Sequence, residues 1–177
     1  MRVINSMIAA NKAGIDLSIY RHIVFIMPGN SCGYAGIANV GCGSVCRAWI
    51  FTGATDAIAH ELGHNLGMRH ASTDTNNDGA MDSEYGDKSC IMGYSGVGWR
   101  QVNAPHKEQM GWFKAYPGAV HTATQSGRYI LSPLEMDPSQ AAAPQILKIR
   151  KGTSSEYYYF SYRLPIGYDS SLGSTYL

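Results

Sequence analysis

Charge is scarce in this sequence. Asp, Glu, Lys and Arg make up 15% of its 177 residues, and the formal net charge is +1, whereas charged residues are about 25% of an ordinary globular domain. With 45% hydrophobic residues, such a chain is expected to fold compactly rather than stay disordered. A net charge near zero provides no general attraction to nucleic acid. We therefore expect no nucleic-acid partner.

Long hydrophobic runs are also missing. The longest local candidate, residues 23–27, is the size of a strand, far short of the roughly 18–20 apolar residues that a membrane span needs. We therefore expect no membrane span. Residues 1–14 have the pattern of a helix rather than of a signal peptide, so we expect that any leader was removed upstream.

Cysteines are few and lack paired Cys-x-x-Cys motifs. The four are Cys32, Cys42, Cys46 and Cys90. An even number favours up to two disulfides in an oxidising compartment, which predicts a secreted, extracellular protein. Three pairings are compatible with the sequence, and four buried thiols in a cytosolic protein are the alternative.

The hydrophobic pattern predicts an α/β fold. We expect helices at residues 1–14 and 54–66, the second capped by Thr52 or Thr55, and a third that begins at Asn103. Strands are predicted at residues 19–27, 47–51, 128–131, 145–150 and 156–162. This predicts a catalytic core over residues 1–116 and a β-rich C-terminal segment over residues 117–177.

The most informative stretch is His60-Glu-Leu-Gly-His64-Asn-Leu-Gly67-Met-Arg-His70. Positions i and i+4 lie on one helix face, so His60 and His64 can bind the same metal ion, with Glu61 beside it. Gly67 can adopt the positive φ of a sharp turn that returns His70 as a third ligand. Chance would produce this pattern in only about 2 of 100,000 such chains.

Three nitrogen ligands leave one coordination position open on zinc, which can lower the pKa of water to about 7. Glu61 would then act as general base and acid in the hydrolysis of a peptide bond. The alternatives are a helix with an amphipathic histidine face and a closed structural zinc site. The other histidines, His22, His106 and His121, are assigned no role.

The extended histidine motif resembles that of the metzincin zinc endopeptidases. In these enzymes a methionine turn lies beneath the metal, which implies that Met92 supports the site, and Tyr94 matches a position whose phenol could steady the oxyanion. The blocks at residues 60–70, 84–94, 103–112 and 158–169 more narrowly resemble the gametolysin family of secreted metalloendopeptidases. The resemblance implies a metzincin-like domain with a mixed sheet, an active-site helix and one catalytic zinc.

An acidic loop follows the histidines. Asp74, Asn76, Asp78 and Asp82 imitate the first half of a calcium loop, but Tyr85 stands where the final bidentate acid is expected. Calcium binding and a solvated Asx-rich loop both remain open. Asp87 is a candidate acceptor for the second ring nitrogen of a ligand histidine.

These motifs predict a zinc-dependent endopeptidase that hydrolyses internal bonds of extracellular or matrix proteins. Its partner would be a protein or peptide substrate, which could lie as an extended chain along the edge of the strand at residues 47–51. A non-catalytic zinc- or calcium-containing module for adhesion or carbohydrate binding is the alternative.

Overall fold

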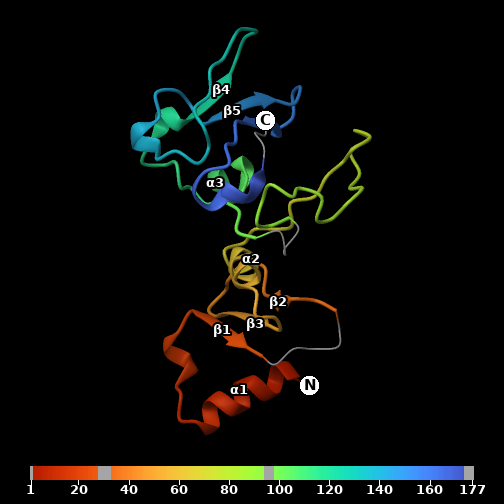
Figure 1. Cartoon of the computed structure of the whole chain (residues 1–177), viewed down its shortest axis with the longest axis vertical. Coiled ribbons are helices and arrows are strands. Elements are labelled where there is room, and N and C mark those ends of the chain that lie inside the picture. The colour runs from red at the N-terminus through yellow and green to blue at the C-terminus, as the bar shows by residue number, and fades with distance from the viewer. Residues whose placement is uncertain (1, 28–32, 94–97, 174–177) are drawn as a thin grey trace. The chain divides into compact units, whose positions relative to one another are not determined.

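The computed structural model describes residues 2–27, 33–93 and 98–173. The chain divides into two compact units, Met1–Gly98 and Trp99–Leu177. Each unit contains a three-stranded mixed sheet and at least one helix (Figure 1). The α/β class expected from the hydrophobic pattern is therefore confirmed. The predicted domain division after residue 116 stays a prediction, although the structure groups the helix after Asn103 with the second unit.

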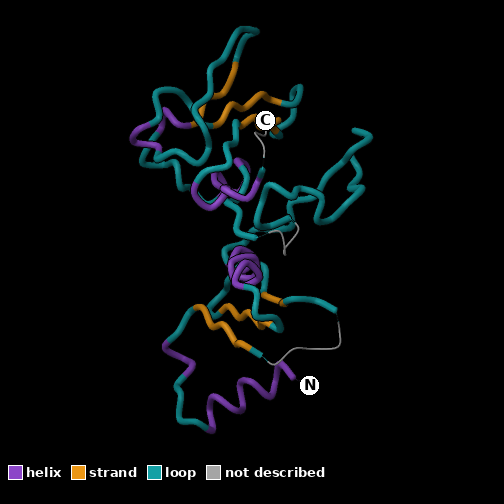
Figure 2. Tube along the Cα trace, viewed as in Figure 1, coloured by secondary structure: helices purple, strands orange, loops and turns teal. Residues whose placement is uncertain are grey.

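The first unit is built around the sheet β1-β3-β2. Its elements are α1 (Arg2–Lys12), the 3-10 helix η1 (Leu17–Ile19), β1 (His22–Ile26), β2 (Gly36–Ala38), β3 (Cys46–Ile50) and α2 (Thr55–Asn65). The central strand β3 runs parallel to β1 and antiparallel to β2. After α2, the described remainder of this unit forms turns and loops (Figure 2).

The two faces of β3 contact different helices. Cys46, Ala48 and Ile50 are fully buried, and α2 packs over β3 and β2. Successive side chains of a strand point to opposite faces, so Trp49 points the other way, where its Nε1 donates to Ser6 Oγ of α1 at 2.9 Å. The sheet is thus held between the two helices, and α2 is anchored on a rigid surface.

Local sequence signals placed these elements well, with two exceptions in this unit. The predicted helices and strands at α1, β1, β3 and α2 are confirmed. The predicted cap of α2 is wrong: the N-cap residue is Ala54, which makes no side-chain cap, while Thr52 Oγ1 accepts from the Ala54 amide at 3.2 Å. Strand β2 was not predicted, because its three residues are too short to show a period.

The second unit contains the other sheet, β4-β5-β6. Its elements are α3 (Ala104–Gln109), η2 (Pro117–Ala119), β4 (Val120–Ala123), η3 (Pro138–Gln140), β5 (Ile146–Arg150), β6 (Tyr157–Ser161) and η4 (Gly167–Leu172). Asn103 caps α3 as predicted, accepting from the His106 amide. The strands predicted at residues 145–150 and 156–162 are confirmed, whereas residues 128–131 form no strand and β4 was missed.

A buried ionic network crosses the second unit. Arg163 Nε donates to Glu135 Oε1 at 2.5 Å, and its Nη2 donates to Asp169 Oδ2. Their side chains are 4%, 1% and 0% exposed, respectively. The network joins residues that are far apart in the sequence. Removing one partner would leave a buried charge uncompensated, which is strongly destabilising.

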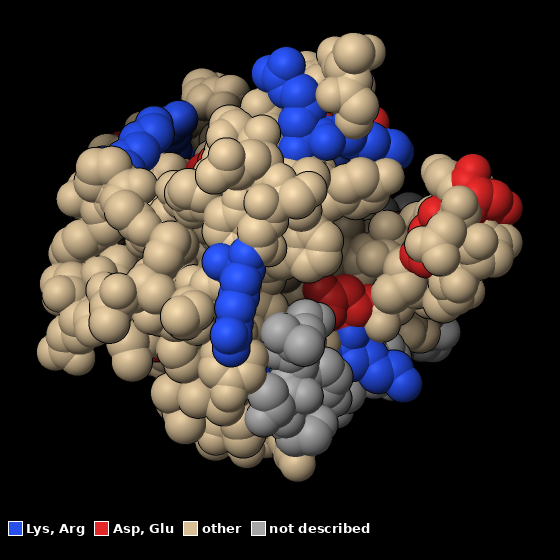
Figure 3. Space-filling view, turned by 90° about the horizontal axis from the view of Figure 1, so that it is seen from above, with Lys and Arg blue, Asp and Glu red and all other residues tan. Residues whose placement is uncertain are grey.

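Charge is as sparse on the structure as in the sequence. The face drawn in Figure 3 consists mostly of residues that are neither acidic nor basic. Within the described residues, none of the helices is long and apolar enough to cross a membrane.

The structure forms one of the disulfides that the cysteine count allowed. Cys42 pairs with Cys46, and Cys90 is fully buried. Cys32 lies outside the described residues.

Candidate metal centre

The end of α2 turns the chain back toward the helix. Gly67 has φ = 96°; its amide donates to His64 O at 2.8 Å, and the Met68 amide donates to Gly63 O at 3.0 Å. These two bonds form a Schellman cap, which needs a left-handed residue at this position. The glycine therefore does what the sequence predicted of it and directs residues 68–70 back along the helix.

Three imidazoles converge at this turn. The metal-binding atoms of His60, His64 and His70 all lie within 4.8 Å of one another, and the Nε2 atoms of His64 and His70 are 3.0 Å apart. His60 and His64 come from one face of α2, as their i, i+4 spacing requires. The three residues predicted as ligands are therefore brought together in one cluster.

The other nitrogen of each ring is already engaged. His60 Nδ1 lies 2.7 Å from Ile91 O, and His64 Nδ1 lies 2.9 Å from Met68 O. His70 Nδ1 lies 2.6 Å from Glu84 Oε1. Oxygen partners at Nδ1 orient a ligand histidine and leave Nε2 for the metal. The donor set therefore fits a zinc ion, which accepts three neutral imidazoles and keeps an open position.

Burial favours the uncharged form of two of these rings, His60 and His64. It lowers the pKa of His60 to about 4, assisted by the nearby His64 and His70. Burial also lowers the pKa of His64. Because a metal ligand must be a neutral imidazole, the site is ready for a cation near neutral pH without first losing protons from these two rings.

A turn containing Met92 lies against α2. Met92 is fully buried, and a Cβ placed on Gly63 would clash with its sulfur. The Met92 carbonyl accepts from the Ala71 amide at 2.8 Å, while its neighbour Ile91 bonds His60. The sulfur thus lies beside the helix between the first two histidines, where a polarisable apolar side chain fills the space against the helix backbone.

Glu61 occupies a buried position next to the histidines. Its side chain is buried, and Oε2 makes no hydrogen bond within the described part of the chain. Burial raises its pKa to about 7. The backbone of Gly36 on β2 lies so close that a Cβ there would be 2.6 Å from Glu61 Cγ. The position of this carboxyl group is therefore limited by β2.

A cleft of about 410 Å³ opens beside Glu61. It is lined by Gly33, Tyr34, Ala35, Gly36, Ala57, His60, Glu61 and Tyr85. The residues of β2 and the segment before it form one wall, and α2 forms the other. We expected the strand at residues 47–51 to offer an edge to substrate, and this is wrong: β3 is the central strand, and β1 and β2 are the two edge strands of this sheet.

Two residues of the site were missed by sequence reasoning. The acceptor for His70 is Glu84, whereas the Asp87 carboxylate accepts from Ser89. The ring of Tyr85 lies 4.1 Å from that of His70, measured between centroids. A ligand histidine needs an oxygen partner for its second ring nitrogen, and this requirement predicted that some oxygen would contact each ring. It did not indicate which of the acids after residue 74 would contact His70.

The acidic loop makes Asx-type hydrogen bonds within itself, although Asp74 Oδ1 has no hydrogen-bond partner among the described residues. Asp82 Oδ2 accepts from the Thr75 amide at 2.7 Å, Asp74 Oδ2 accepts from the Gly79 amide, and Asn76 Oδ1 accepts from the Asp78 amide. The described residues contain two clusters able to hold a metal, and neither includes these acids. The calcium prediction thus gains no support. Tyr94 lies outside the described residues.

Comparison with known proteins matches nearly the whole chain. The sequence profile of the gametolysin peptidase M11 family matches residues 5–177. A protein named autolysin from Chlamydomonas reinhardtii is 30% identical over 189 residues, an alignment that covers 86% of this chain and 28% of that protein. No solved structure matches the chain significantly. The chain therefore spans less than a third of the length of this relative.

Proposed function

The chain belongs to the gametolysin peptidase M11 family, and we propose that it is a zinc-dependent endopeptidase that hydrolyses internal peptide bonds of extracellular proteins. The observation that carries this function is the convergence of three oriented imidazoles beside the buried Glu61. In a purely structural zinc site, a carboxyl group that lines a cleft and has a raised pKa, such as Glu61, would have no function. Such a group is typical of a catalytic site.

In this proposal, His60, His64 and His70 hold the zinc through Nε2. When bound, zinc supplies Lewis-acid chemistry, which polarises a carbonyl and makes water a stronger acid. Ile91 O, Met68 O and Glu84 keep the three rings in the orientation that this binding needs.

Glu61 moves the proton. Its carboxylate would accept a proton from the attacking water on the side that lines the cleft and later donate it to the departing amine. Without the metal, burial raises the pKa of Glu61 to about 7; the positive charge of bound zinc would lower this pKa and favour the carboxylate that accepts the proton. Gly36 keeps the carboxyl group in place by closing off the space behind it.

The substrate would lie along β2. An extended peptide that pairs with the outer edge of this strand would make main-chain hydrogen bonds, which depend little on its sequence. Because β2 and Glu61 line the same cleft, such a peptide would pass in front of the carboxyl group. Side-chain selectivity would then come from the cleft wall, where Tyr34 and Tyr85 are aromatic.

The arrangement we propose for this unit is metzincin-like. Met92 would support the histidines from beneath, in line with its contact with Gly63. Tyr94 would steady the oxyanion, a role taken from its position two residues after Met92. We further propose that the protein acts outside the cell, where the Cys42–Cys46 disulfide is stable.

The deciding experiment compares the zinc-loaded wild type with Glu61→Gln on a mixed library of unstructured peptides, read by mass spectrometry. We expect internal cuts by the wild type that disappear in the variant while bound zinc is unchanged. The exposed Glu156, replaced by Gln, is the matched control and should leave cleavage intact. Equal cleavage by both enzymes, or none by a folded zinc-loaded wild type, would sink this mechanism and favour a non-catalytic binding module.

A further inference from the structure

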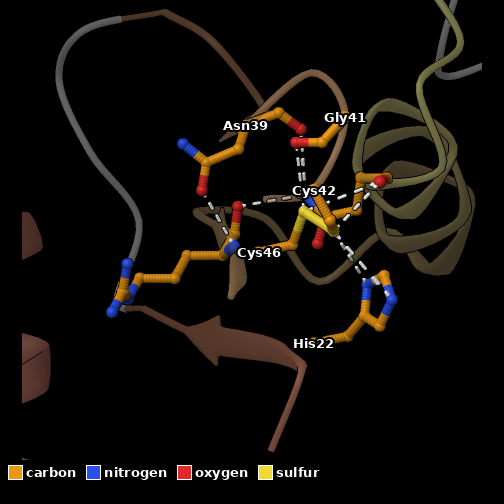
Figure 4. Close-up of a disulfide and its surroundings, with 7 residues drawn as sticks. His22, Asn39, Gly41, Cys42 and Cys46 are labelled. Carbon is orange, nitrogen blue, oxygen red and sulfur yellow. Dashed lines mark hydrogen bonds between the residues drawn. A yellow bond between two sulfur atoms is a disulfide. The ribbon is translucent and has the colours of Figure 1, made fainter. Parts of the chain in front are cut away.

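A second cluster of metal-binding side chains lies in the first unit. His22, Cys42 and Cys46 place their ligand atoms within 4.8 Å of one another, and this is the other of the two clusters found in the described residues. None of its members belongs to the histidine site. Figure 4 shows the imidazole of His22 directed at the sulfur of Cys42.

Backbone structure, rather than the disulfide alone, brings the three residues together. His22 and Cys46 are direct partners in the parallel pairing of β1 with β3. Cys42 is returned to them by a tight loop that begins at Gly41, where φ is 74°. The Gly41 amide donates to His64 O at 2.8 Å, which fastens this loop to the end of α2. The cluster should therefore persist when the disulfide is opened.

One distance between ligand atoms already suits a zinc site, whereas the two sulfurs must separate from their disulfide to bind one ion. His22 Nδ1 lies 3.7 Å from Cys42 Sγ, close to the roughly 3.5 Å between nitrogen and sulfur in tetrahedral zinc with bonds of about 2.0 and 2.3 Å. The two cysteines are four positions apart, within the Cys-x2–4-Cys range of structural zinc motifs. Cys46 is buried while His22 is exposed, so an ion could enter from the His22 side.

We propose that His22, Cys42 and Cys46 form a redox-controlled second zinc site. The disulfide state excludes the ion, because a sulfur in a disulfide is no thiolate ligand. A dithiol reductant supplies two electrons and two protons, becomes a disulfide itself and leaves two thiols on the protein. Zinc then binds both sulfurs as thiolates together with the neutral imidazole, and two protons pass to solvent.

Reduction should leave the fold intact. The disulfide closes a loop with a sequence separation of only 4, and a short closed loop restricts the unfolded chain less than a long one. Strand pairing between β1 and β3 and the bond from Gly41 to His64 do not involve the sulfurs. The exchange between disulfide and zinc thus needs only local movement of the two cysteine side chains.

The test counts zinc. Wild-type protein saturated with zinc, before and after treatment with a phosphine reductant, is freed of excess metal and measured by elemental mass spectrometry. We expect the count to rise by one zinc per chain on reduction. His22→Ala should remove this increment, whereas the exposed His121→Ala should keep it. Reduced protein loaded with cobalt should show a thiolate-to-cobalt charge-transfer band that is lost in His22→Ala.

Two results would overturn the site: no increment in folded, reduced wild type, or an increment that survives His22→Ala. The second result would assign the metal to other cysteines. The increment is counted separately from zinc at the histidine site and from peptide cleavage. Failure of the endopeptidase proposal and failure of this one are therefore distinguishable.

Discussion

Replacing Gly36 by Ala should weaken catalysis while leaving the fold and the metal in place. Gly36 lies on the edge strand β2, and its backbone faces the Glu61 side chain. Its φ is outside the left-handed region, so alanine is compatible with the backbone there. The only change is a methyl group placed against the carboxyl group that we propose as general base.

The size of the effect follows from the contact. The added Cβ would lie 2.6 Å from Glu61 Cγ, 2.7 Å from Oε1 and 2.8 Å from Cδ, whereas ordinary contact begins at 3.4 Å. The carboxyl group must therefore move by about 0.6–0.8 Å. Misplacing a reacting group by about 1 Å can cost on the order of 100-fold in rate, so we expect kcat to fall about 10- to 100-fold.

Stability should fall only modestly, because the displaced atoms belong to one side chain, which is buried but flexible, and not to the backbone. We expect the free energy of unfolding to change by less than about 1 kcal/mol, partly offset by the lower backbone entropy of alanine in a strand. The assay measures kcat on one peptide identified from the library, with bound zinc and the thermal midpoint determined on the same samples. Zinc should stay at the wild-type level, since no ligand is touched.

Gly53→Ala is the matched control. It makes the same chemical change at a glycine whose φ is also outside the left-handed region and where a Cβ would meet nothing within 4 Å. We expect wild-type kcat from this variant. A Gly36→Ala enzyme with undiminished kcat would refute the claim that β2 positions Glu61, and a loss of zinc would show that the strand supports the metal site instead.

Three further substitutions test other contacts. Glu84→Ala removes the oxygen partner of His70 and should weaken zinc binding about 10- to 100-fold, measured by chelator competition. Gly63→Ala pushes a methyl group into Met92 and should destabilise the first unit by about 1–3 kcal/mol in urea unfolding. Arg163→Met leaves two buried carboxylates unpaired and should destabilise the second unit by about 3–5 kcal/mol, visible as a lower thermal midpoint. A wild-type value for any of these variants would contradict the role that we assign to the contact it alters.

Local sequence was sufficient to predict that His60, His64 and His70 cluster. The i, i+4 spacing of His60 and His64 places both on one face of α2 whatever surrounds the helix. Gly67 then ends the helix because it alone pays no steric penalty for positive φ, and the short return brings His70 back. These features all lie within eleven residues, so they can be predicted without knowledge of the rest of the fold.

Partners at longer range could not be chosen in the same way. Glu84 is fourteen residues from His70, and several acids in the same loop had equal claims, since only the folded course of residues 71–93 brings one carboxylate to the ring. The cysteine count allowed three disulfide pairings, and only the folded chain brings Cys42 to Cys46. In the same way, only the register of β1 against β3 places Cys46 opposite His22.

The order of strands had the largest consequence for function. The pattern of residues 47–51 correctly indicated a strand. The same pattern is compatible with an edge strand and with a central strand, because hydrophobic periodicity shows which side chains are buried but not which strands pair. The tertiary structure puts β3 in the middle, and the three residues of β2 form one of the two edges. That arrangement places Gly36 against Glu61 and opens the cleft beside the histidine cluster. Residue types and spacing thus pointed to the chemistry that we propose, while packing between distant segments decided which surface surrounds the proposed general base, Glu61.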